Sequence, residues 1–173
     1  MVFSIVSPPH TISSGDFFIE GGNSIKLRQS LPELIGETLW LNGAVTTKEL
    51  IGDQPCIVHF WSVSCDLCTD VMPEFNRLRN KYRNAMNVVA VHMPRAKGDK
   101  DLQDIERSVK KYGMTQPVFV DNNLHLTKQF GNQFVPAYYL FDRNGKLRHV
   151  QAGGGGMNLL EMRIKRLLEE SRR

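Results

Sequence analysis

The sequence predicts an α/β fold in which a central mixed β-sheet is flanked by helices on both faces. Short, almost continuously apolar runs recur along the chain, and segments with helical spacing of apolar residues lie between them. An apolar run of this kind is typical of a strand that is buried on both faces. The alternation indicates parallel strands early in the chain, and two runs joined by a tight turn indicate a later antiparallel hairpin.

The 173 residues suit one domain, which can form a core without disulfide bonds. Residues 1–30 mix polar and turn-forming residues without a sustained period, so we predict a partly ordered N-terminal extension with some β structure. Residues 31–173 are predicted to form the domain proper. It begins with a short strand and turn around Leu39 and Leu41.

Three buried strands are expected before the hairpin. CIVHFWSV (56–63) is rich in β-branched and aromatic residues, and NVVAVHM (87–93) has the same character. QPVFVD (116–121) gives the third strand. In AYYLFDRNGKLRHV (137–150), the turn sequence DRNG separates two apolar runs, which predicts the hairpin.

Four helices are expected between and after these strands. Over residues 66–82 the apolar positions recur every three or four residues, and Pro73 lies inside this helix. Two shorter helices, within 101–113 and 123–131, each end on a glycine, which is a common C-terminal signal. The last helix, within 157–171, follows four consecutive glycines that lack the spacing of a phosphate-binding loop. The helix within 101–113 and the strand at 116–121 lie between the second buried strand and the hairpin.

The motif that carries chemistry is the cysteine pair of SCDLC, where the first buried strand meets the first long helix. Cys65 is expected at the helix N-terminus, where unpaired N–H groups and the helix dipole favour a thiolate nucleophile. Cys68 follows one turn later on the same side and can resolve a mixed disulfide between Cys65 and a substrate. A single pair of this spacing beside a βαβ pattern indicates a redox role.

Zinc binding is an alternative role, because Cys56 and His59 would complete a set of four ligands. These two residues are three positions apart in a strand and therefore point to opposite faces, so we expect no metal. A structural disulfide between Cys65 and Cys68 would close too short a loop to restrict the unfolded chain much. Cys56 is expected to be a small buried hydrophobic residue.

Together these motifs resemble the thioredoxin-like superfamily. FWSVSCDLC after a buried strand, Pro73 in the next helix and the later FVPAYYLFDRNGKL are similar to its active-site segments. The helix and strand between the second buried strand and the hairpin are similar to the extra α/β insertion of the TlpA/ResA branch of thiol-disulfide oxidoreductases. That branch is related to the AhpC/TSA redoxins. The resemblance covers residues 31–172. It implies an enzyme without a cofactor that acts on protein disulfides or thiols and receives electrons from a reductase.

The resemblance also implies roles for residues outside the cysteine pair. A cis peptide bond before Pro136 is expected to lie against the disulfide, with the backbone of Val135 pairing with substrate. The alternative is a trans proline at the start of an edge strand. His59 occupies the position of a buried aspartate that relays a proton in thioredoxin, so it is expected to do acid–base work or to be a core histidine. Trp61 is expected to support the site.

Three positions depart from the family pattern. His59 replaces the aspartate, Ser64 replaces a tryptophan before the first cysteine, and Val71 replaces the buried glutamate of many TlpA/ResA proteins. Asp66 and Asp70 lie near the cysteines, and a carboxylate beside a thiolate raises the pKa of the thiol. This arrangement favours a reductase over an oxidase.

Composition limits the classes of partner. The net charge is only +4, and the basic C-terminal segment lacks the interleaved aromatic residues of a nucleic-acid site. The first residues lack the pattern of a signal peptide, and no segment has the length of a membrane span. We therefore expect a cytoplasmic protein that does not bind nucleic acid and does not span a membrane. The sequence gives no oligomeric state.

Three functions follow from the sequence. The first is a cytoplasmic thiol-disulfide oxidoreductase that reduces protein disulfides. The second is a thiol peroxidase of the peroxiredoxin type, although the proline that precedes the peroxidatic cysteine in that family is absent before Cys65. The third is a binding module of thioredoxin fold that uses its cysteine pair as a redox sensor.

Overall fold

A six-stranded mixed sheet forms the centre of a computed structural model of the chain, which describes residues 24–171. The strand order across the sheet is β1-β4-β3-β2-β5-β6. β2, β3 and β4 are parallel, whereas β1, β5 and β6 each run antiparallel to their neighbours. The mixed sheet predicted from the sequence is therefore confirmed. The strands are β1 (Leu39–Leu41), β2 (Cys56–Trp61), β3 (Asn87–His92), β4 (Val118–Val120), β5 (Ala137–Phe141) and β6 (Leu147–Ala152).

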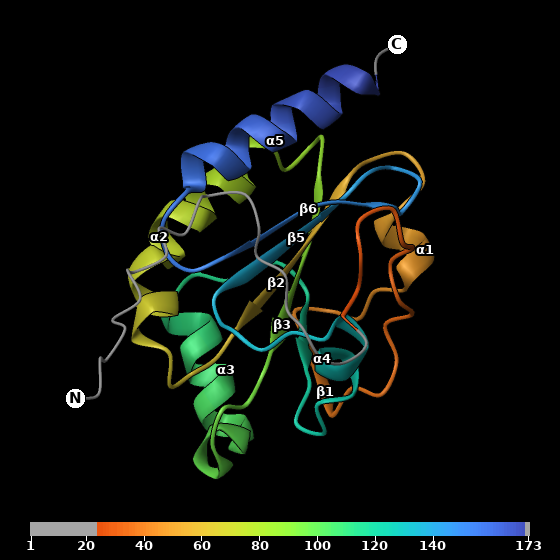
Figure 1. Cartoon of the computed structure of the whole chain (residues 1–173). Coiled ribbons are helices and arrows are strands. Elements are labelled where there is room, and N and C mark those ends of the chain that lie inside the picture. The colour runs from red at the N-terminus through yellow and green to blue at the C-terminus, as the bar shows by residue number, and fades with distance from the viewer. Residues whose placement is uncertain (1–23, 172–173) are drawn as a thin grey trace, which may run out of the picture.

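Helices cover both faces of this sheet, as the apolar strands require (Figure 1). The helices are α1 (Thr47–Leu50), α2 (Asp66–Lys81), α3 (Leu102–Lys111), α4 (His125–Phe130) and α5 (Met157–Glu170), with a 3₁₀ helix η1 (Lys97–Lys100) before α3. One hydrophobic core joins the sheet to α2, α3 and α5, and a second core joins the opposite face to α1 and α4. The predicted two-sided packing is confirmed.

β2 is buried along its whole length and contributes to both cores. Ile57 and Trp61 belong to the core beneath α2, whereas Cys56, Val58 and Phe60 belong to the core beneath α4. His59 stacks on Tyr138, which is part of the core beneath α2. Cys56 and His59 thus lie on opposite faces of the sheet, as the strand period predicts.

Two short elements were not predicted from the sequence. α1 has only four residues and begins with a capping box, in which the side chains of Thr46 and Glu49 each accept a hydrogen bond from the other residue's backbone N–H. η1 also has four residues and lies between β3 and α3. Elements of this length have too few residues to show a helical period, so no sequence pattern identifies them.

The described part of the N-terminal extension is tied to the domain by backbone hydrogen bonds. The Ile25 N–H donates to the carbonyl of Phe130 over 3.1 Å, and the Arg28 N–H donates to that of Leu147 over 2.8 Å. An isolated antiparallel bridge between Ser30 and Lys146 extends this contact to the residue just before β6. Residues 1–23 lie outside the described residues, and the division of the chain at residue 30 stays a prediction. Within 24–171, no helix is long and apolar enough to cross a membrane.

Candidate active site

Cys65 lies at the junction between β2 and α2, where it is the N-cap residue of the helix. Its Sγ accepts a hydrogen bond from the backbone N–H of Cys68 over 3.1 Å, so the side chain satisfies one of the free donors of the first turn. Cys65 and Cys68 are joined by a disulfide, with their Cα atoms 5.2 Å apart. The structure therefore places the pair at the helix N-terminus expected from the sequence.

The disulfide is packed against the segment that precedes β5. Cys68 is fully buried, whereas 3% of Cys65 is exposed, so Cys65 is the more accessible member of the pair. The Cys65 Sγ lies 3.6 Å from the carbonyl oxygen of Val135. The peptide bond between Val135 and Pro136 is cis. The Val135 carbonyl thus meets Cys65 from seventy residues away in the sequence.

Trp61 is a core residue at the end of β2, just before the loop that leads to Cys65. Its side chain is fully buried in the core that also contains Cys65 and Cys68. Its ring makes an edge contact with the imidazole of His92, with 5.1 Å between the ring centroids. The indole N–H has no hydrogen-bond partner among the described residues. Packing is therefore the contribution of Trp61 that the structure shows.

His59 lies deeper on β2 and is surrounded by aromatic rings. Its imidazole stacks on Tyr138 at 4.8 Å and packs against Phe75 at 4.4 Å between centroids. Neither ring nitrogen has a hydrogen-bond partner in the described chain. Burial, with a smaller effect of the Arg79 charge, lowers the pKa of His59 to about 3, so the imidazole is neutral near pH 7. Its expected acid–base role stays a prediction.

A carboxylate that the sequence analysis missed, Asp99 of η1, binds the loop just before Cys65. Its Oδ2 accepts hydrogen bonds from the hydroxyls of Ser62 and Ser64, over 3.1 and 2.8 Å. The backbone N–H groups of Arg95 and Ala96 donate to the same oxygen, over 2.8 and 3.1 Å. Burial alone would raise the pKa of Asp99, but these four bonds outweigh it and lower the pKa, so the group is held as a carboxylate.

His92, at the end of β3, supports the same loop from below. Its Nε2 accepts a hydrogen bond of 3.4 Å from the backbone N–H of Val63, which requires the neutral ring. Burial lowers the pKa of His92 to about 4, against a smaller opposing effect of the Asp99 charge. The loop between β2 and Cys65 is thus held by one neutral imidazole and one ionised carboxylate.

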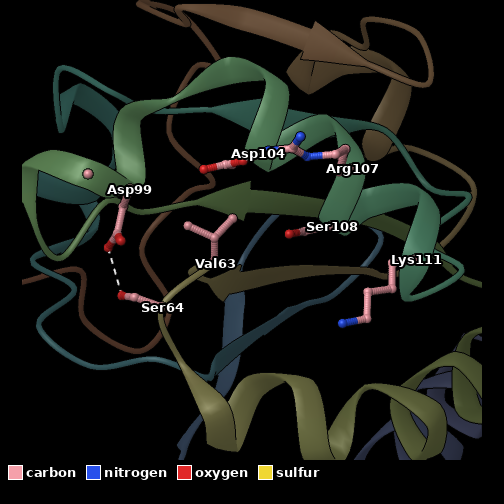
Figure 2. Close-up of a pocket in the computed structure, with 8 residues that line it drawn as sticks. Val63, Ser64, Asp99, Asp104, Arg107, Ser108 and Lys111 are labelled. Atoms are coloured by element: carbon pink, nitrogen blue, oxygen red, sulfur yellow. Dashed lines mark hydrogen bonds and ion pairs between the residues drawn. The ribbon is translucent and has the colours of Figure 1, made fainter.

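A hollow of about 460 Å³ opens beside this loop. Figure 2 shows Val63 and Ser64 on one side, Asp99 at one end, and Asp104, Arg107, Ser108 and Lys111 of α3 on the other side. Asp104 and Arg107 form an ion pair within α3. No cluster of three or more histidine, cysteine or acidic side chains that could hold a metal ion occurs in the described part of the chain.

Comparison with known proteins agrees with this geometry. The AhpC/TSA family model matches residues 29–150. The chain is 53% identical to the Bacillus subtilis protein named thiol-disulfide oxidoreductase YkuV, over 85% of this chain and 99% of that protein. It is 25% identical to the Halalkalibacterium halodurans thiol-disulfide oxidoreductase ResA, over 76% of this chain and 68% of that protein.

The solved structures give the same result. A solution structure of a thioredoxin-like protein in the oxidised form superposes with a TM-score of 0.78, at 53% identity, over 84% of this chain and 99% of that chain. These matches confirm the thioredoxin-like fold and the TlpA/ResA-type resemblance that the sequence motifs indicated. With its cysteine pair at the N-terminus of α2, this chain belongs to the AhpC/TSA family.

Proposed function

We propose that this thiol-disulfide oxidoreductase works as a reductant of protein disulfides, with Cys65 as the nucleophile and Cys68 as the resolving thiol. The observation that carries the proposal is the disulfide between Cys65, the N-cap of α2, and Cys68 in the first turn. A helix N-terminus stabilises a thiolate, and the greater exposure of Cys65 makes its sulfur the one that a substrate can reach.

The reaction starts from the dithiol. The Cys65 thiolate attacks one sulfur of the substrate disulfide, forms a mixed disulfide and releases the other substrate sulfur, which takes up a proton. The Cys68 thiol then loses its proton and attacks the Cys65 Sγ. This second step forms the Cys65–Cys68 disulfide and releases the second substrate thiol. Two electrons and two protons pass to the substrate, and an electron-donor reductase of the dithiol–disulfide class returns the pair to its starting state.

Val135 and Pro136 are assigned to substrate binding. The carbonyl of Val135 lies 3.6 Å from the Cys65 Sγ, so an extended substrate segment that pairs with this backbone would bring its own sulfur close to Cys65. Trp61 is assigned a packing role in the core that contains the disulfide. His59 is assigned a supporting role in the same core, because its low pKa makes it a weak base near pH 7.

Three cysteine variants test the chemistry. We expect Cys65→Ser to abolish reduction of a protein disulfide such as that of insulin. Cys68→Ser should instead accumulate a mixed disulfide between Cys65 and the substrate, which mass spectrometry detects. Cys56→Ala is the matched control and should keep full turnover, because Cys56 lies on the other face of β2. A Cys68→Ser protein that traps no substrate would contradict the proposed roles, and rapid consumption of peroxide by the wild type would favour the peroxidase alternative.

The redox direction has its own test. The equilibrium of the Cys65–Cys68 pair with glutathione gives its reduction potential, read by thiol alkylation and mass. A value near that of thioredoxin, about −270 mV, is the expected result, and a value near about −120 mV would identify an oxidant. We also propose that the reaction takes place in the cytoplasm, where dithiols are kept reduced. Cell fractionation with an antibody against the native protein tests that assignment.

A further inference from the structure

We propose that Asp99 is a positioning residue for Cys65, and that its negative charge beside the loop helps to keep the pair a reductant. This inference rests on the proposed function for its meaning, but its geometry is independent of the direction of the reaction. Asp99 comes from η1, which lies between β3 and α3. It reaches back to the loop that delivers Cys65 to the start of α2.

The first observation is that a single carboxylate oxygen of Asp99 accepts all of its hydrogen bonds to the loop and to its own turn. The Asp99 Oδ2 accepts four hydrogen bonds, two from the hydroxyls of Ser62 and Ser64 and two from backbone N–H groups at the start of η1. The backbone bonds fix the carboxylate relative to its own turn, and the serine bonds fix the loop relative to the carboxylate. Bonds to an ionised acceptor are about twice as strong as neutral ones.

The second observation is where this contact lies. Ser64 is the residue immediately before Cys65, and its hydroxyl is 2.8 Å from the Asp99 Oδ2 (Figure 2). The carbonyl of Ser64 also accepts a 3.2 Å bond from the Arg95 guanidinium. Ser64 is therefore held on its side chain and on its backbone by the same segment. A shift of this residue would move the Cys65 Sγ relative to the helix N-terminus and to the Val135 carbonyl.

The third observation is the burial of the carboxylate. Only 5% of Asp99 is exposed, so water screens its charge weakly. The charged and titratable groups near it include Arg95, Lys97 and Lys100 of its own segment, His92 at the end of β3, and Asp104, Arg107 and Lys111 of α3 across the hollow. His92 is neutral and Arg107 is paired with Asp104. A negative charge held here disfavours the thiolate of Cys65, and a less stable thiolate makes the dithiol a better electron donor.

Two substitutions separate position from charge. All four bonds use one oxygen, so Asp99→Asn can keep them with its carbonyl oxygen while it removes the charge. Asp99→Ala removes both the four hydrogen bonds and the charge. We expect Asp99→Ala to slow reduction of insulin disulfides about tenfold, because small displacements of a reacting group are costly. Asp99→Asn should recover most of this rate, and the pH profile of Cys65 alkylation should move down by about half a unit relative to wild type.

Asp104→Asn is the matched control, because Asp104 lines the same hollow but bonds to Arg107 instead of the loop. It should change neither the rate nor the pH profile. If Asp99→Ala fails to fold, Ser64→Ala removes only one of the four bonds and should slow reduction about threefold. A rate within twofold of wild type in the folded alanine variants, or an equal loss in Asp104→Asn, would overturn the positioning role. An unmoved alkylation profile in Asp99→Asn would overturn the role of the charge.

These outcomes are distinct from a failure of the proposed function. The wild-type reduction potential alone decides whether the pair is a reductant. The difference between Asp99→Asn and wild type decides whether Asp99 acts on Cys65, whichever direction the pair favours. Alkylation of Cys65 in the reduced protein needs no substrate, so it reports on Asp99 even if insulin is not reduced.

Discussion

His59 and Asp99 show two opposite fates of a buried titratable group in one molecule. His59 lies between aromatic rings, has no hydrogen-bond partner within residues 24–171, and has its pKa lowered to about 3, so it is neutral. Asp99 is almost as buried, but four donors surround one oxygen and lower its pKa, so it is ionised. Burial favours the uncharged form, and directed donors reverse that preference for an acid.

The comparison also shows that the position of a residue in the family pattern does not determine its charge, because the charge depends on the groups that surround the side chain. His59 stands where thioredoxin has a buried acid, yet its surroundings keep it uncharged and offer its ring nitrogens no hydrogen-bond partner among residues 24–171. Asp99 lies on η1, between β3 and α3, and holds the loop before the cysteine pair. Near neutral pH, the buried negative charge next to the loop before Cys65 comes from a different part of the chain.

The largest expected effect comes from a third buried group, Asp121, which is fully buried and also surrounded by donors. Its carboxylate accepts bonds from the N–H groups of His125, Leu126 and Thr127 and from the Thr127 hydroxyl. Asp121→Ala leaves these donors at the start of α4 without partners, so we expect the free energy of unfolding to fall by about 3 kcal/mol. Urea denaturation with an unchanged m-value measures this loss.

Asp121→Asn serves as the comparison variant, because its carbonyl oxygen can still accept part of these bonds. It should lose clearly less stability than Asp121→Ala. An alanine variant that loses less than about 1 kcal/mol would mean that water replaces the carboxylate at this helix, and that donor-rich burial is not what sets Asp99 and Asp121 apart from His59.

An intermediate effect is expected from the titration of His59. Its folded pKa of about 3 lies below the ordinary value of 6.5, so the unfolded chain binds more protons between these values and stability falls as the pH drops through that range. For one such histidine, the loss from about pH 7 to about pH 5 is about 2 kcal/mol.

His59→Leu should remove this pH-dependent part. It should leave the parts that come from His92, whose pKa burial lowers to about 4, and from His149, whose pKa burial also lowers. Between about pH 7 and about pH 5 the His92 part is about as large as the His59 part, so the slope should fall without vanishing. Urea denaturation at a series of pH values measures the slope, whatever the absolute stability of the variant. An unchanged slope in His59→Leu would show that His59 is not held neutral by burial, and would restore it as a candidate proton carrier.

The smallest effect is expected at the surface. Glu161 accepts hydrogen bonds from Lys81 and Tyr82, over 2.7 and 2.8 Å, and these bonds lower its pKa to about 2. The Glu161 carboxylate therefore accepts several hydrogen bonds, as the Asp99 carboxylate does, but it lies next to solvent. Glu161→Gln should lower the free energy of unfolding by less than about 1 kcal/mol, because water and salt screen exposed pairs. Thermal denaturation of Glu161→Gln and wild type at low and high salt measures this loss of stability. A larger loss that salt does not reduce would mean that burial does not set the size of these effects.

The sequence predicted most of the fold because the long elements have strong local patterns. Cys56–Trp61 is apolar at nearly every position and α2 has a clear helical period, so both could be identified without tertiary information. The cysteine pair could be placed for the same reason, since a strand followed directly by a helix puts Cys65 at the N-terminus. The contact with Val135, by contrast, was expected only from the family resemblance.

What the sequence could not show are contacts between segments that are distant in the chain and have no pattern of their own. Asp99 lies in a four-residue 3₁₀ helix and meets Ser64 from thirty-five positions away. Nothing in KGDK distinguishes this aspartate from a solvated surface charge. The neutral state of His59 also depends on its neighbours, because Phe75 and Tyr138 come from different elements.

The third cysteine, Cys56, can serve as a probe of global unfolding. Cys56 is fully buried in β2, between β3 and β5, and burial, with a smaller effect of Asp142, raises the pKa of its thiol to about 12. Alkylating reagents can therefore reach it only when the central strand leaves the sheet, which requires unfolding of nearly the whole domain. After Cys65 and Cys68 have been blocked, the rate at which Cys56 is alkylated would measure the rate of this unfolding. The same burial prevents Cys56 from forming a wrong disulfide with Cys65 or Cys68.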